Sequence, residues 1–169
     1  MAKWDQALKV AAASHPRTRE QTIAYGTAGF RTKAELLDHV MYRMGLLAVL
    51  RSRAKGDSPL VGRIQPLCVG ITIDCSGAMI TASHNPGPDN GIKLVDPKGE
   101  MLEAAWESVA TKLANCKDED IPTVLDQIVE QFNIPEIDSQ VVVGHDTRVS
   151  SPALSRACLA GIAGVKRAH

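Results

Sequence analysis

The chain lacks several features that would assign it to a common class of protein. It has no apolar run of the roughly 18–20 residues that a membrane helix needs, and its beginning lacks the apolar core of a signal peptide. Its 19 basic and 19 acidic residues cancel, so it lacks the basic field that attracts nucleic acid. We therefore expect neither a membrane partner nor a nucleic-acid partner.

The four cysteines lack the CxxC spacing of zinc sites and thioredoxin-type redox pairs; they are Cys68, Cys75, Cys116 and Cys158. With 44% hydrophobic and 22% charged residues, the composition is that of a globular protein and excludes a disordered chain. We expect a folded protein in a reducing, cytoplasmic setting, with the cysteines as small core residues.

Helical and strand-like patterns alternate along the chain, which predicts an α/β layered sheet with helices on both faces. The expected helices are 3–14, 32–55, 103–115, 118–132 and a last one from 151 onward. The expected strands are 22–24, 67–73, 77–82, 92–95 and 140–143. Thr32 and Glu35 have capping-box spacing, and Ser151 followed by Pro152 predicts a cap before a proline at the first helical position.

Three loops are the places to look for chemistry, because ligands of layered α/β folds collect beyond the carboxyl ends of strands. They are residues 25–31, 83–91 and 144–150. In the second loop, Ser83 follows an apolar strand, with His84 beside it and Lys93 beyond the turn at Asn90-Gly91. A cation near a hydroxyl suits phosphoryl transfer, because the charge on the phosphoryl oxygens must be neutralised. The alternative is an ordinary surface turn.

The other two loops supply candidate anion contacts. Asp146 can orient Arg148, whose guanidinium would then present a fixed fork of donors to a phosphate. The alternative is a structural Asp–Arg pair at a strand end. Gly26 and Gly29 let the backbone approach a ligand closely, and Arg31 follows them as a further anion contact.

Taken together, these motifs resemble the α-D-phosphohexomutases, and within them the branch that acts on N-acetylglucosamine phosphates. The resemblance rests on TASHNPGPDNGIKLVDPKGEML, with YGTAGFRTKAELLDHVMYRMGLLAVLRS before it and GHDTR after it. It implies a three-layer α/β/α sandwich with a mixed sheet, the family's domain I, at residues 22–169. Residues 1–21 would form an N-terminal helix and linker.

The resemblance also implies residue roles. Ser83 would carry the phosphoryl group, whose oxygens would ligate Mg²⁺. His84 would help to hold the phosphoserine loop, and Arg31 and Lys93 would be candidates for acid and base catalysis. The residues expected on the substrate and phosphate side are Arg148, Asp146 and Asn85.

The implied reaction interconverts N-acetylglucosamine 6-phosphate and 1-phosphate through a bound hexose bisphosphate. The family has four domains, and we expect only the first one here. Domains II–IV would supply the other Mg²⁺ ligands and the sugar site, so we expect this polypeptide alone to have little turnover. Two alternatives stay open: a mutase of another hexose phosphate, or a non-catalytic module that binds phosphate or a partner protein.

One departure from the family pattern is an apparent insertion at residues 63–77, which separates Val61-Gly62 from the resumed motif at Ala78. We interpret it as a retained intron or an alternative exon. In that case the apolar segment 67–73 would be a surface excursion that invites association.

Overall fold

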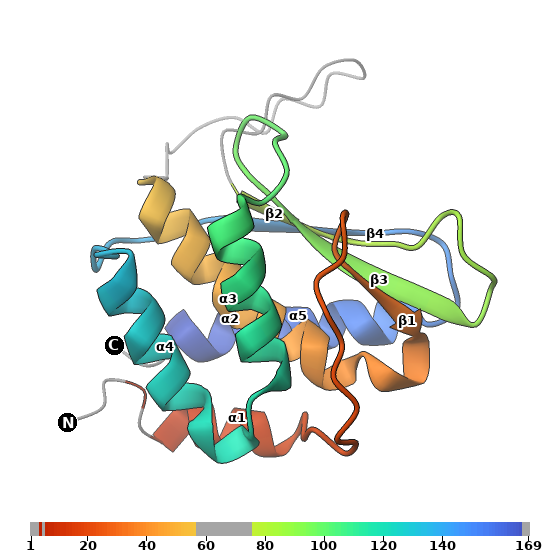
Figure 1. Ribbon diagram of the computed structural model, residues 1–169, viewed down its shortest axis with the longest axis horizontal. Helices are drawn as coiled ribbons and strands as arrows, with labels where there is room; N and C mark the ends of the chain where they lie inside the picture. Colours follow the sequence, from red (N-terminus) through yellow and green to blue (C-terminus); the bar gives the residue numbers. More distant parts are fainter. Residues whose placement is uncertain (1–3, 5, 57–75, 167–169) are drawn as a thin grey trace.

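The computed structural model describes residues 4, 6–56 and 76–166. In these residues a sheet lies against a group of helices (Figure 1). The strands are β1 (Phe30–Lys33), β2 (Ser76–Ile80), β3 (Asp89–Val95) and β4 (Val141–His145). The helices are α1 (Gln6–Ala13), α2 (Asp38–Lys55), α3 (Ala104–Asn115), α4 (Ile121–Gln131) and α5 (Ser151–Lys166), with short 3₁₀ turns η1 (Ala34–Leu36) and η2 (Asp118–Asp120). None of the helices in the described part of the chain has the length and apolarity to cross a bilayer.

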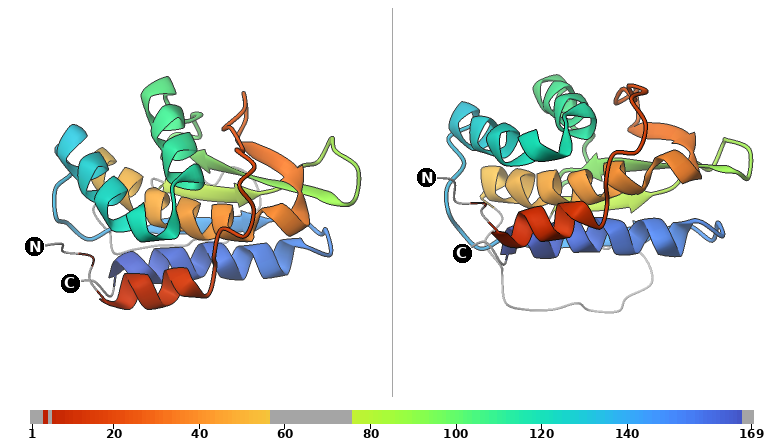
Figure 2. Two further views of the ribbon diagram at one scale, coloured as in Figure 1. Left: turned by 60° about the horizontal axis from the view of Figure 1, so that its bottom comes forward. Right: turned by 90° about the horizontal axis from the view of Figure 1, so that it is seen from below.

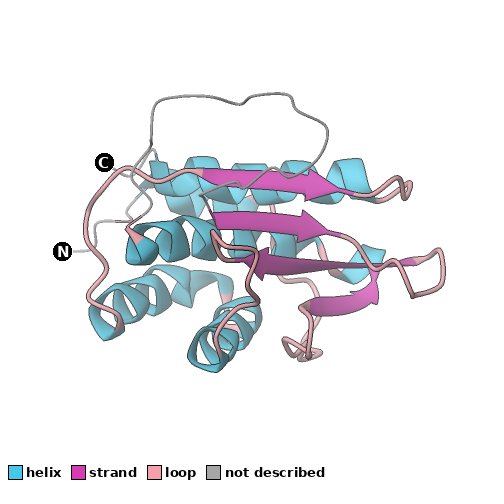
Figure 3. Cartoon of the chain, turned by 90° about the horizontal axis from the view of Figure 1, so that it is seen from above, coloured by secondary structure: helices cyan, strands magenta, loops and turns pink. Residues whose placement is uncertain are grey.

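The sheet is mixed, as expected, and its strand order is β1-β3-β2-β4. β3 runs antiparallel to both β1 and β2, whereas β4 runs parallel to β2. Side chains alternate between the two faces. The residues buried toward the helices are Phe30, Ala78, Ile80, Ile92 and Leu94. On the other face Met79 is 39% exposed and Val142 is 40% exposed, so within the described residues the helices cover one face of the sheet (Figure 3).

Helices α2 and α5 form the layer next to the sheet and lie side by side (Figure 2). Their close approach requires glycine. A Cβ added at Gly45 would overlap the Cys158 carbonyl oxygen, and one at Gly161 would overlap the Tyr42 carbonyl oxygen. α1 packs against α5, α3 against α2, and α4 against α3. The structure therefore confirms the α/β class. The three-layer expectation also places helices on the second face of the sheet, and the described residues form no helix there.

The helices were well predicted by their apolar periodicity. α3 and α4 bury the expected stripes, including Trp106, Leu113 and Leu125. α2 ends where Lys55-Gly56 indicated, with Gly56 in the left-handed region at φ 70°. These patterns involve only residues close together in the sequence, so distant parts of the fold do not alter the helices that they predict.

The region before α2 was predicted wrongly. Thr32 lies inside β1, where it pairs with Asn90, so it does not cap a helix. α2 begins at Asp38, and its N-cap residue Leu37 makes no side-chain capping bond. Residues 22–24 form no strand. Strand pairing with β3 has thus overridden the capping-box pattern.

Two other expectations are wrong, and a third falls largely outside the described residues. Asn90 and Gly91 belong to β3 and do not close a turn. The Ser151 hydroxyl binds Asp146 rather than a helix amide, and Ser151 is already the first residue of α5. The strand 67–73 and residues 63–75 of the expected insertion lie outside the described residues. The last two residues of that segment, Ser76 and Gly77, begin β2 and pair with β4.

Candidate active site

Two of the three predicted loops meet at one edge of the sheet. β2 and β4 are parallel, so both end at this edge, and the Asp146 N–H donates to the Ile80 carbonyl oxygen at 3.1 Å. The serine loop, residues 81–88, therefore lies beside the loop between β4 and α5. This is the carboxyl edge at which ligands of such folds bind.

Asp146 joins the two loops through its carboxylate. Its Oδ2 accepts a hydrogen bond from the Thr81 hydroxyl at 2.9 Å, and its Oδ1 accepts one from the Ser151 hydroxyl at 2.5 Å. The Arg148 Nε–H also donates to Asp146, at 3.3 Å, so the expected Asp146–Arg148 pair is confirmed. Burial acts to raise the pKa of Asp146, but the bonds from Ser151, the Arg148 N–H and Thr81 hold this pKa below its ordinary value.

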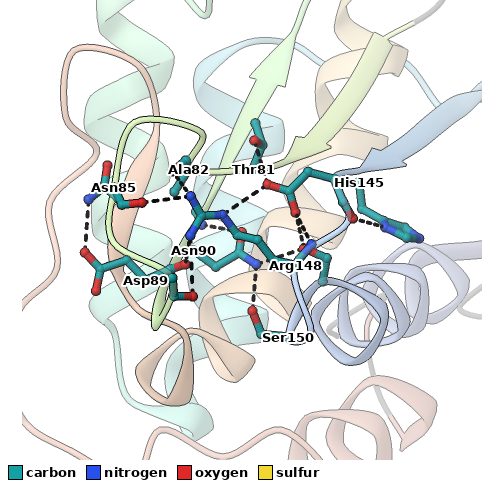
Figure 4. A network of polar contacts seen from close by, with 12 residues as sticks. Thr81, Ala82, Asn85, Asp89, Asn90, His145, Arg148 and Ser150 are labelled. Atoms are coloured by element: carbon teal, nitrogen blue, oxygen red, sulfur yellow. Dashed lines mark hydrogen bonds and ion pairs between the residues drawn. The ribbon is translucent and has the colours of Figure 1, made fainter.

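Arg148 reaches into the serine loop and binds its main-chain carbonyls (Figure 4). One terminal nitrogen donates to the carbonyls of Pro86 at 2.8 Å and Asp89 at 3.0 Å, with Gly87 at 3.4 Å. The other terminal nitrogen donates to the carbonyls of Asn85, at 2.9 Å, and Ala82. A guanidinium has five N–H donors, and with Nε on Asp146 all of them are engaged. In this geometry Arg148 holds the loop and leaves no donor for a phosphate.

Ser83 itself is exposed at the surface of the loop, and His84 beside it is exposed as well. No hydrogen bond joins the described part of the chain to the Ser83 hydroxyl or to the His84 imidazole, so the loop-holding that we expected of His84 falls to Arg148 in this structure. The Asn85 side chain donates to Asp89 at 3.1 Å, and its main-chain N–H donates to Ala82. Asn85 thus shapes the loop.

Arg31 and Lys93 lie on the uncovered face of the sheet. Arg31 pairs with Gly91, and Lys93 pairs with Met79; since Gly91 and Lys93 are two residues apart in β3, both cations project from the same face. A Cβ built on Gly91 would lie 3.0 Å from both the Arg31 Cγ and the Thr81 carbonyl oxygen. The stem of Arg31 therefore lies across β3, next to the start of the serine loop.

Two structural residues of the site were missed by sequence reasoning. Asn90 is fully buried, and its amide donates to the hydroxyls of Ser150 and Ser151 at 2.8 and 2.9 Å. Tyr25 accepts the Leu94 N–H at 3.2 Å, beyond the last residue pair of β1 and β3. Asparagine after a Gly/Pro-rich loop reads as a turn, so nothing in the sequence indicated that Asn90 would be buried.

A hollow of about 70 Å³ opens beside Lys93. Tyr25, Gly99, Met101 and Glu107 are among the residues that line it. Burial is the largest influence on the Tyr25 hydroxyl and raises its pKa, so this phenol stays protonated at neutral pH. Within the described residues no cluster of three His, Cys, Asp or Glu side chains could hold a metal ion.

The amino-acid sequence of the chain is similar to those of known phosphosugar mutases. Residues 71–120 match the family described as phosphoglucomutase/phosphomannomutase, alpha/beta/alpha domain I. Over 152 residues the chain is 49% identical to phosphoacetylglucosamine mutase of Homo sapiens, a match that covers 89% of this chain and 25% of that protein. Over 161 residues it is 41% identical to the Saccharomyces cerevisiae enzyme, covering 90% and 26%. The chain thus spans about a quarter of the length of these relatives.

Solved structures give the same result. A variant of Aspergillus fumigatus N-acetylphosphoglucosamine mutase in complex with glucose 1,6-bisphosphate superposes with a TM-score of 0.84 at 40% identity, over 98% of this chain and 28% of that one. The enzyme from the same fungus in complex with GlcNAc-6P and magnesium gives 0.80 at 40% identity, over 98% and 27%. The chain is thus similar in sequence and in fold to the α-D-phosphohexomutases, and its residues 71–120 match their α/β/α domain I.

Proposed function

We propose that this chain supplies the phosphoserine loop of a mutase that interconverts N-acetylglucosamine 6-phosphate and N-acetylglucosamine 1-phosphate. The observation that carries the proposal is Ser83, an exposed hydroxyl on a loop whose backbone is fixed by Arg148. The choice of amino sugar rests on the 49% identity to the human phosphoacetylglucosamine mutase, against the other hexose phosphates that the wider family model includes.

The reaction would proceed by two phosphoryl transfers. Phosphorylated Ser83 would give its phosphoryl group to the free hydroxyl of the sugar monophosphate, which yields a bound bisphosphate and the Ser83 hydroxyl. The bisphosphate would then return its other phosphoryl group to Ser83. Arg31 and Lys93, on the face beside the loop, would neutralise the transferring oxygens and exchange the proton of the sugar hydroxyl. His84, exposed next to Ser83, would contact the phosphoryl group or the sugar.

The chain fits Mg²⁺ in part. The Asp146 carboxylate is occupied by Thr81, Ser151 and Arg148, so it is not a free ligand. The oxygens of a phosphoryl group on Ser83 would hold the ion from this side, and other ligands would come from the remaining domains. A bound Mg²⁺ would supply Lewis-acid stabilisation of the phosphoryl oxygens. Arg148, Asp146 and Asn85 would act on the phosphate only through the shape of the loop.

The domain assignment is part of the proposal. Residues 22–169 would be domain I, with residues 1–21 as an N-terminal helix and linker, and 63–77 as an added segment. α1, in the first of these parts, packs against α5 and so joins the domain's core. The activity would need the three further domains.

A chimera tests the proposal. This chain replaces the matching quarter of the human phosphoacetylglucosamine mutase, and turnover of N-acetylglucosamine 6-phosphate is measured with Mg²⁺ and glucose 1,6-bisphosphate. We expect turnover in the chimera, a single phosphoryl adduct mapped to Ser83 by mass spectrometry, and loss of both in Ser83→Ala.

The matched control is Ser108→Ala, because Ser108 is an exposed serine on α3 far from the serine loop in sequence. It should keep the adduct and the turnover. A folded chimera whose turnover is the same with and without the Ser83 hydroxyl would refute the proposal. Purified alone, the 169-residue chain should show no steady-state turnover.

A further inference from the structure

The contacts of Arg148 fix the direction of the peptide groups in the serine loop. All peptide bonds in the described residues are trans, and in a planar trans peptide the C=O and the next N–H point in opposite directions. The Ala82 carbonyl points at the Arg148 guanidinium. The main-chain N–H of Ser83, in the same peptide group, therefore points away from Arg148.

The two prolines of the loop follow from the same geometry. The carbonyls of Asn85 and Gly87 also point at Arg148, and the next residues are Pro86 and Pro88. Proline has no N–H, so these two peptide groups turn no donor outward. Of the peptide groups that Arg148 binds within the serine loop, only those before Ser83 and Gly87 keep an N–H.

The N–H groups of Ser83, His84 and Gly87 have no acceptor among the described residues, whereas two other amides of this region are paired. The Asn85 N–H donates to Ala82 and the Asp89 N–H donates to Pro86. Buried or half-buried amides are normally paired, and an unpaired one at an exposed serine is free to bind a ligand. The loop carbonyls thus point toward Arg148, and the unpaired N–H of Ser83 lies in the same residue as the Ser83 hydroxyl.

We propose that Arg148 is a positioning residue that directs the Ser83 main-chain N–H to the phosphoryl group carried on the Ser83 side chain. The donor hydrogen-bonds a phosphoryl oxygen, and Arg148 itself never touches the phosphate. The inference rests on the proposed function, because it takes phosphoserine as the ligand. Its chemistry is that of other phosphate-binding loops, in which backbone N–H groups face the anion.

The test installs phosphoserine at position 83 during synthesis of the chain, so it requires no mutase activity. The amide resonance of residue 83 is followed by ¹H–¹⁵N NMR while the phosphate is titrated through its second pKa, near 6. An N–H bound to the phosphate moves downfield as the phosphate becomes a dianion. We expect a larger downfield shift in the folded chain than in the same chain unfolded in urea.

Arg148→Lys should reduce this shift to its urea value, because the three donors of a lysine ammonium cannot replace a guanidinium that binds five carbonyls. Arg156→Lys is the matched control, since Arg156 is an exposed arginine on α5, and it should keep the full shift. Equal shifts in the folded and unfolded wild-type chain would overturn the proposal even if Arg148→Lys failed to fold. A folded Arg148→Lys chain with the full shift would overturn it as well.

The outcome separates this inference from the proposed function. If Ser83 is not the phosphoryl carrier, the Ser83→Ala chimera stays active, whatever the NMR titration shows. If only the role of Arg148 is wrong, the chimera behaves as proposed and the amide shift does not depend on folding or on Arg148.

Discussion

The side chain of Arg31 lies across Gly91, the residue with which it pairs between β1 and β3. A Cβ at position 91 would lie 3.0 Å from the Arg31 Cγ and would overlap the Phe30 carbonyl oxygen. Gly91 is thus the reason that a cation from an edge strand can extend across the central strand toward Thr81. Loss of this space affects both the packing of β1 on β3 and the position of Arg31.

Gly91→Ala should therefore destabilise the fold by about 1–3 kcal/mol, the usual cost of forcing extra atoms into a packed site. Urea unfolding measures the change. Gly87→Ala is the control, because a Cβ there meets nothing within 4 Å and Gly87 has no positive φ. It should change the unfolding free energy by less than about 0.5 kcal/mol. Equal effects of the two substitutions would contradict this account.

Arg43 closes the end of α3 from the side of α2. It is fully buried, and one terminal nitrogen donates to the carbonyls of Leu113, Ala114 and Cys116. Its other terminal nitrogen donates to Asp118 at 2.6 Å. Arg43→Met leaves these acceptors buried without a donor, so we expect a loss of about 3–5 kcal/mol of stability in chemical denaturation.

The control for Arg43 is Arg19→Met. Arg19 is 63% exposed on its side chain, and its ion pair with Glu35 is 3.7 Å long. Such surface pairs contribute little, so the change should stay below about 0.5 kcal/mol. A loss at position 43 no larger than this would show that the α3 end does not depend on the buried arginine.

His39 is a buried imidazole that predicts a pH dependence of stability. Burial, and then the charges of Arg43 and Arg17, lower its pKa to about 4 against the opposing effect of Asp118 and Asp38. Its Nε2 is buried and unpaired in the described residues. The unfolded chain, with an ordinary pKa of 6.5, binds the proton more readily. Stability from the neutral ring is therefore complete above pH 6.5 and is lost as pH falls toward 4.

The full loss corresponds to about 3 kcal/mol, from roughly 1.4 kcal/mol for each pKa unit. His39→Gln should flatten the fall in unfolding free energy between about pH 6.5 and about pH 4, measured by urea denaturation across that range. His84→Gln, at an exposed histidine, should leave the slope of the wild-type chain. If both variants keep that slope, another group causes the acid sensitivity.

Gly45 lies where the backbones of α2 and α5 approach each other closely. A Cβ there would overlap the Cys158 carbonyl oxygen, in the backbone of α5, which cannot move away as a side chain can. We expect Gly45→Ala to lower stability by more than about 1 kcal/mol, although alanine is the better helix former by a similar amount. Gly56→Ala makes no such clash, so it serves to separate packing from strain: its cost arises only from φ 70°. Thermal and urea unfolding measure the stability of both variants. A Gly45→Ala chain more stable than the wild type would contradict the close contact between α2 and α5.

Much of the architecture was predictable because helix signals are local. Apolar residues at helical spacing predicted α3 and α4, and Gly56 predicted the end of α2. Strand pairing is not local. The expected cap at Thr32 became a strand residue because Asn90, far along the chain, offers it a partner. The serine loop ended earlier than expected for the same reason.

The sequence by itself determined which chemical groups the site contains: a serine hydroxyl in TASHNP, an Asp–Arg pair in GHDTR and two cations, in a pattern specific enough to indicate the family. Only the tertiary structure decided what each group does. From the sequence, Arg148 is expected to bind phosphate. In the structure its five donors bind Asp146 and the carbonyls of a loop that lies 59 to 66 residues earlier in the chain. The physical reason is that a side chain's donors go to the acceptors that folding brings within reach, and the order of residues does not record those distances.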